Sequence, residues 1–202
     1  MSEEVVMRHG VPVAHLESEE EYFYRQDAEL IGKMRKRAAA EEEHRLIANT
    51  AHTEDPKILE ELEKLGYTHT TVMLLSLVPL VELAWVDGSV SPEERGRLLA
   101  LAGERGIEEN TPAHQQLVEW LDHCPSRAFF EGTWHTLEKL LESLPVDDRE
   151  SGKNALIRSC KEFASATCAH IGWVGRVCAA KRELLRKSAH RLNSPHSSVC
   201  AA

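Results

Sequence analysis

Apolar residues recur every three or four positions along most of the chain, which is the period of an α-helix. Between residues 126 and 144, Phe130, Trp134, Leu137, Leu141 and Leu144 follow this spacing. No comparable run alternates polar and apolar residues, as a half-buried strand would. The pattern predicts an all-α fold, a compact bundle of about seven or eight helices.

Cap residues mark where these helices begin and end. Asp55-Pro56, Ser91-Pro92 and Thr111-Pro112 each place a proline directly after an N-cap residue. Ser18 and Glu21 have the spacing of a capping box, which predicts a long helix from Ser18 to about Ala48. The predicted helices begin near residues 18, 56, 69, 91, 111, 126, 147 and 175, and Gly66, Val86, Gly106 and Pro145 end four of them.

These elements divide the chain into four predicted segments. Residues 1–17 lack periodicity and are expected to be a flexible lead-in, and residues 194–202 are expected to be a disordered tail. Residues 18–66 form an N-terminal helical extension, and residues 67–193 form the main helical domain. The long helix of the extension carries four apolar residues in its first half, Phe23, Leu30, Ile31 and Met34.

A weak internal repeat lies within the main domain. A shift of 87 residues aligns Gly88, Val90, Arg95 and Leu98 with Gly175, Val177, Arg182 and Leu185. One interpretation is a second, degenerate helix–loop–helix that packs pseudo-symmetrically against the first. The second copy departs from the first at two acidic positions, because Val174 replaces Asp87 and Lys181 replaces Glu94.

The charge of the chain limits the kinds of molecule that it is expected to bind. The formal net charge of −9 argues against a general nucleic-acid binder, which needs clustered cations for phosphate contacts. Residues 152–193 nevertheless carry nine Lys and Arg against two Glu. The last predicted helix contributes Lys181, Arg182, Arg186 and Lys187 to this basic segment. These four residues are candidates for binding an acidic partner, an RNA or a membrane surface, or for pairing with the acidic remainder of the chain.

Cysteine usage and hydropathy indicate a cytoplasmic protein. The five cysteines are odd in number and lack CxxC spacing, which is typical of reduced thiols. The first 21 residues contain no apolar run of a signal peptide. The most apolar stretch, residues 72–86, is too short to span a membrane and includes Pro79 and Glu82, so we expect a buried core helix.

The segment from Val78 to Ile107 carries the most informative pattern. An apolar helix ends at the Asp87-Gly88 turn, and a second helix begins with Ser91-Pro92 and two glutamates. This order of apolar helix, Asp-Gly, β-branched residue and acidic helix start resembles the signature of TerB-like domains. The resemblance covers about 30 residues in detail and extends in helix order over roughly residues 80–190.

The TerB-like resemblance implies a small helical bundle associated with bacterial tellurite and stress resistance. Such domains are discussed as interaction or ion-sensing modules rather than as enzymes. Carried over residue by residue, it implies an acidic surface formed by Asp87, Glu93 and Glu94, which Glu82 can join. Converging carboxylates would suit Ca²⁺ or Mg²⁺. Helix capping and compensation of the helix dipole explain the same residues without any ion.

Two other functions fit parts of the sequence. Glu41 and His44 have the Glu-x-x-His spacing of di-iron proteins, which would make the chain a metal-dependent, ferritin-like oxidoreductase. Alternatively, the long N-terminal helix pairs with a second copy and the chain is a structural oligomer. Because no catalytic constellation stands out, the main prediction is a non-enzymatic TerB-like module that acts through protein contacts and an acidic ion-binding surface. Its expected partner is another protein or a second copy of the chain.

Overall fold

The structure is a computed structural model of the chain, and it describes residues 7–8, 11–168 and 174–193. Side chains are described at residues 22, 24–167 and 179–192. The predicted tail over 194–202 and much of the predicted lead-in over 1–17 lie outside these ranges. The described residues are almost all helical, which confirms the all-α prediction.

The chain divides into two units, Met1–Arg45 and Leu46–Ala202. In the first unit, strands β1 (Met7–Arg8) and β2 (Val11–Pro12) pair antiparallel, which the sequence analysis did not predict. Helix α1 (Val13–Ala51) follows directly, and its last residues belong to the second unit. The predicted helix start at Ser18 is therefore wrong, because the preceding residues, including Ala14 and Leu16, favour helix and extend it.

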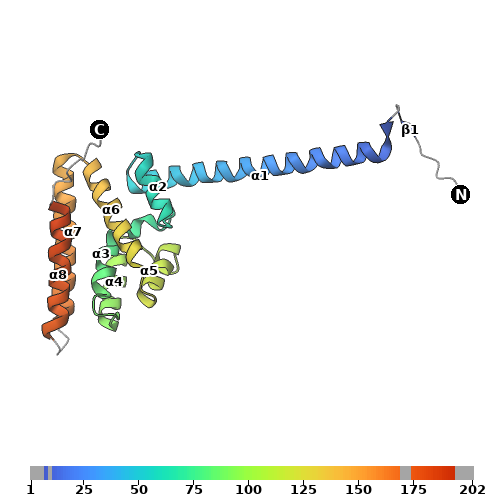
Figure 1. The fold of residues 1–202 in the computed structure, drawn as a ribbon. Helices are drawn as coiled ribbons and strands as arrows, with labels where there is room; N and C mark the ends of the chain where they lie inside the picture. The colour runs from blue at the N-terminus through green and yellow to red at the C-terminus, as the bar shows by residue number, and fades with distance from the viewer. Residues whose placement is uncertain (1–6, 9–10, 169–173, 194–202) are drawn as a thin grey trace. The chain divides into compact units, whose positions relative to one another are not determined.

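The second unit contains eight elements, ordered as drawn in Figure 1. They are α2 (Pro56–Lys64), the 3-10 helix η1 (Val72–Leu77), α3 (Val78–Ala84), α4 (Pro92–Glu104), α5 (Pro112–Asp122), α6 (Arg127–Ser143), α7 (Val146–Cys168) and α8 (Val174–Asn193). Helices α7 and α8 lie side by side in Figure 1 and are in contact.

The predicted caps explain most of these helix starts. Asp55, Ser91, Thr111 and Ser126 are the N-caps of α2, α4, α5 and α6, and each side chain accepts a backbone N–H. Gly66 follows the end of α2 with φ +85°, a conformation that is costly for residues with a Cβ. Local sequence signals therefore determined these boundaries.

The predicted helix over 69–86 is instead η1 followed by α3. Pro79 has no backbone N–H, so it cannot continue an α-helical hydrogen-bond ladder from the preceding turn. It lies in the first turn of α3, where a missing N–H costs little. The prediction of one continuous helix is wrong, but the prediction that this stretch is buried is confirmed, since α3 packs against η1, α4, α6 and α7.

The core of the second unit also includes residues that precede Gly66. Ile47, Ile58 and Leu62 are at most 2% exposed and belong to the same buried cluster as α3. The structural division therefore lies at Arg45, whereas the sequence analysis placed a boundary after Gly66. No described helix is both long and apolar enough to cross a membrane.

Candidate functional site

The turn between α3 and α4 has the predicted geometry. Gly88 adopts φ +89°, and its N–H donates to the carbonyl of Trp85 at 2.9 Å. Asp87 is exposed on this turn. Ser91 and Glu94 then form a capping box at the start of α4, as the sequence predicted.

Glu94 faces the interior rather than the surface. Its Oε2 accepts hydrogen bonds from the backbone N–H and the hydroxyl of Ser91, at 2.9 and 2.8 Å. Its Oε1 accepts from the Nζ of Lys181 on α8, which also donates to the Thr167 hydroxyl at 3.2 Å. The side chains of Glu94 and Lys181 are 1% and 0% exposed, so they form a fully buried ion pair that joins α4 to α8.

This buried pair removes one residue from each of two predicted surfaces, the acidic one and the basic one. Glu94 does not belong to an exposed acidic surface, because Lys181 and Ser91 occupy its carboxylate. Lys181 does not belong to an exposed basic surface, because its ammonium is turned inward. The internal repeat aligns these two positions, because Lys181 lies 87 residues after Glu94. That alignment was the only sequence signal that connected them.

The other predicted acidic residues also have local roles. Glu93 pairs with Arg97 one turn later on α4, at 3.1 Å. Glu82 on α3 is half-buried and accepts a hydrogen bond from the indole N–H of Trp134, at 2.7 Å. Burial raises the pKa of Glu82, and the Trp134 hydrogen bond and the nearby Arg191 oppose that rise.

The structure does not gather the four predicted carboxylates. Among the described residues, no three His, Cys, Asp or Glu side chains are grouped so that they could hold a metal ion. Glu41 of the predicted di-iron motif pairs with Arg37 at 2.9 Å on the exposed part of α1. Whether the protein binds a metal stays an untested prediction.

Two of the predicted basic residues of α8, Arg186 and Lys187, border a groove between α8 and α6. Arg186 and Lys187 both pair with Glu183, at 2.8 and 3.8 Å, and Arg182 is exposed. The groove has a volume of about 770 Å³. Its lining comes from α3, α6 and α8 and consists of Glu82, Arg127, Glu131, Trp134, Leu184, Arg186, Lys187, Ser188, His190 and Arg191.

Charges in this groove are largely compensated within the protein. Arg127 pairs with Glu131 at 2.7 Å, and Arg191 approaches the buried Glu138 at 3.3 Å. The Ser188 hydroxyl donates to the carbonyl of Leu184, so it is engaged within its own helix. The groove therefore resembles a polar seam between two helices more than a site prepared for one charged ligand.

A second, smaller cavity of about 390 Å³ lies between α5 and the start of α6. Tyr67, Trp120 and Phe129 form an aromatic cluster beside it, with ring centroids 5.1 to 6.1 Å apart. The Tyr67 hydroxyl is 3.2 Å from that of Thr133. Because Tyr67 and Trp120 are buried, we attribute this cluster to packing.

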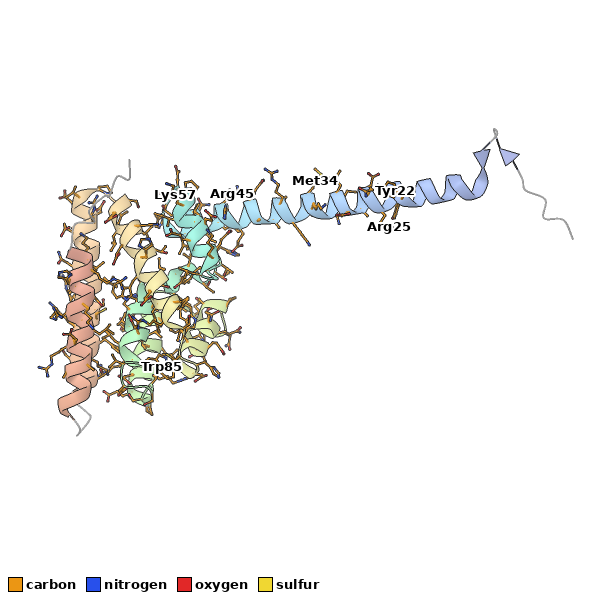
Figure 2. The ribbon with its side chains drawn as sticks, in the orientation of Figure 1. Tyr22, Arg25, Met34, Arg45, Lys57 and Trp85 are labelled. Carbon is orange, nitrogen blue, oxygen red and sulfur yellow. The ribbon has the colours of Figure 1, made fainter. Side chains whose placement is uncertain are left out.

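Most of the exposed large apolar residues lie on α1. Among the described residues, seven large hydrophobic side chains are exposed, and five of these belong to α1. Figure 2 shows the side chains of Tyr22, Arg25 and Met34 standing away from the ribbon of α1. The five are Tyr22, Tyr24, Leu30, Ile31 and Met34. Leu30, Ile31 and Met34 were predicted as the apolar residues of this helix, but no sequence pattern indicates that they are exposed.

Comparison with protein-family models, curated proteins and solved structures gave no match for this chain. The TerB-like resemblance of Val78–Ile107 therefore stays a prediction based on its residues.

Proposed function

We propose that this chain is a non-enzymatic, TerB-like helical module that contributes to tellurite or stress resistance through protein contacts. The observation that supports it best is the apolar surface of α1. Tyr24 is 80% exposed and Met34 is 64% exposed, and both lie on one long helix. Large apolar side chains that cluster in the open commonly mark a surface that another protein covers.

The contrast within the chain strengthens this proposal. The second unit buries most of its large apolar residues from α2 to α8 in one cluster, with Met73 and Val146 as exposed exceptions. In α1, none of the described side chains between residues 22 and 45 is buried. A helix gains most of its stability from packing an apolar face, so α1 has more to gain from a partner than the bundle has.

Ion binding is not part of this proposal. Glu94 is neutralised by Lys181, Glu93 pairs with Arg97, and Glu82 is engaged by Trp134. Three of the four predicted carboxylates therefore already have partners within the chain.

The test is a deletion of the gene in its host, followed by complementation and growth on graded concentrations of tellurite. The informative variant is Ile31→Glu/Met34→Glu, which places two charges on the apolar surface of α1. The matched control is Ala39→Glu/Ala40→Glu, which adds the same charges at exposed positions on other sides of the helix. We expect the wild-type gene and the control to restore tolerance and the informative variant to fail.

Two results would contradict the proposal. If deletion leaves tolerance to tellurite and to oxidative stress unchanged, the link to resistance is wrong. If Ile31→Glu/Met34→Glu restores full tolerance at wild-type protein levels, the α1 surface is not how the protein acts.

A further inference from the structure

Four of the five exposed apolar residues of α1 are arranged as a stripe, and Tyr22 lies outside it. At 100° per residue, Leu30, Met34, Ile31 and Tyr24 fall within about 120° of one another around the helix axis. Leu30 is 57% exposed and Ile31 is 48% exposed, so the whole stripe is open to solvent. This width is typical of a helix that packs against one or two other helices.

Charges along α1 alternate in blocks. The sequence has three consecutive glutamates at 19–21, then Lys33 and three consecutive basic residues at 35–37. Tyr24, Leu30 and Ile31 lie between these blocks, and Met34 lies within the basic block. The acidic block and the basic block are therefore placed on either side of a centre near Ala28.

We propose that the α1 stripe pairs with the α1 stripe of a second copy in antiparallel orientation, with the two-fold axis near Ala28. This inference rests on the proposed function, because it names the partner that the α1 surface contacts. In that arrangement the acidic block of each copy lies opposite the basic block of the other. Tyr24 of each copy lies beside Ile31 of the other, so these two apolar residues face each other near the axis.

Charge distinguishes this arrangement from a parallel one. In a parallel, in-register pair, residues 33–37 of one copy would face the same basic residues of the other, and like charges at close range oppose pairing. The antiparallel pair avoids this repulsion, because each basic block lies opposite an acidic block. Its least favourable point is Asp27, which lies on the stripe close to the axis, so the two Asp27 carboxylates repel each other.

Sedimentation equilibrium of the full chain tests the association itself. We expect the wild type to dimerise, and Ile31→Glu/Met34→Glu to weaken the dimer at least about 100-fold, because two charges would enter an apolar interface. The control Ala39→Glu/Ala40→Glu should change the dissociation constant by less than about threefold. Asp27→Asn should tighten the dimer several-fold by removing the repulsion at the axis.

Crosslinking tests the orientation. Tyr24→Cys and Ile31→Cys are made separately, mixed and treated with a short bis-maleimide, and the linked peptides are identified by mass spectrometry. An antiparallel pair gives the link from position 24 of one copy to position 31 of the other in the mixture. A link between two copies of position 24, formed by Tyr24→Cys alone, would indicate a parallel pair and overturn the proposed geometry.

The outcomes separate this inference from the proposed function. A full chain that stays monomeric at about 100 µM overturns self-pairing. If Ile31→Glu/Met34→Glu then still abolishes tellurite tolerance, the proposed function stands with a different partner. A dimer that is lost in this variant without any loss of tolerance supports self-pairing and contradicts the proposed function. A dimer that the variant leaves intact overturns the role of the stripe.

Discussion

Glu94 serves two structural purposes with one carboxylate. One oxygen completes the cap of α4 through Ser91, and the other accepts from the buried ammonium of Lys181. Replacing one partner of a buried ion pair leaves the other charge without compensation in a low-dielectric interior. We therefore expect the pair to specify where α8 docks more than it adds net stability.

The first prediction concerns this pair. Lys181→Met and Glu94→Gln should each lower the free energy of unfolding by about 3–5 kcal/mol. The double variant should cost clearly less than the sum of the two, because no unpaired charge remains. Urea denaturation of the wild type, the two single variants and the double variant measures this double-mutant cycle.

Lys187→Met, an exposed change on the same helix, is the control and should cost at most about 0.5 kcal/mol. Additive single effects would mean that the two charges do not stabilise each other.

Glu82 provides a second prediction, on pH dependence. Burial raises its pKa in the folded state above the usual value, so the folded protein holds this proton more tightly than the unfolded chain does. The resulting stability is fully present below the ordinary glutamate pKa and is lost as the pH rises through the raised pKa. Glu82→Gln removes this loss and keeps an oxygen for the Trp134 indole.

Melting temperatures at pH 4 and pH 7.5 measure this effect. We expect the melting temperature of Glu82→Gln, relative to wild type, to be higher at pH 7.5 than at pH 4. Glu131→Gln, at an exposed position of the same groove, should show a smaller pH-dependent difference. A variant that is less stable than wild type only at pH 7.5 would mean that the ionised carboxylate of Glu82 is favourable.

Contacts between distant residues were harder to predict from the sequence than contacts within one helical turn. Capping by Ser91 and Glu94 was predictable because both residues lie within one helical turn. The burial of Glu94 depends on Lys181, which lies on the last helix, and no local pattern signals such a contact. The same reason explains Glu82, whose partner Trp134 is on α6.

At the scale of elements, helix starts with a cap and a proline were predicted to within one residue. Asp55-Pro56, Ser91-Pro92 and Thr111-Pro112 all begin helices in the structure. Errors occurred where the local signal was ambiguous. Residues 72–78 are apolar except for Ser76, so their periodicity could not distinguish η1 from an α-helix. Helix α1 begins before Ser18 because good helix formers precede that residue.

The third prediction tests whether the Ser91 cap stabilises the start of α4. Ser91→Ala removes the side-chain acceptor for the Glu94 N–H and one donor to the Glu94 carboxylate. It should lower the free energy of unfolding by about 1–2 kcal/mol, the usual range for an N-cap serine. Ser89→Ala, in the same turn and exposed, should cost less than about 0.5 kcal/mol. Equal costs at both positions would show that the cap contributes little to α4.

At the scale of the molecule, composition and periodicity were sufficient to predict an all-α fold, whereas the division into units was not predictable from turns alone. Gly66 is a strong chain-reversal signal, yet α2 before it packs against α6 after it. A turn residue shows where a helix ends and does not show whether the next helix shares its core. Ile58 and Leu62 of α2 are buried in this core, so α2 belongs to the bundle.

The fourth prediction uses truncated chains to test whether the bundle begins at Leu46 or after Gly66. A chain that begins at Leu46 keeps the entire buried cluster, so it should unfold cooperatively and melt within a few degrees of the full chain. A chain that begins at Tyr67 lacks Ile47, Ile58 and Leu62, each of which is at most 2% exposed. Loss of such side chains costs about 1.5–3 kcal/mol each, which is a large part of the 5–15 kcal/mol that typically stabilises a domain. We therefore expect the Tyr67 chain to lose cooperative unfolding in circular dichroism and calorimetry. A Tyr67 chain as stable as the Leu46 chain would show that α2 is an appendage and that the domain begins after Gly66.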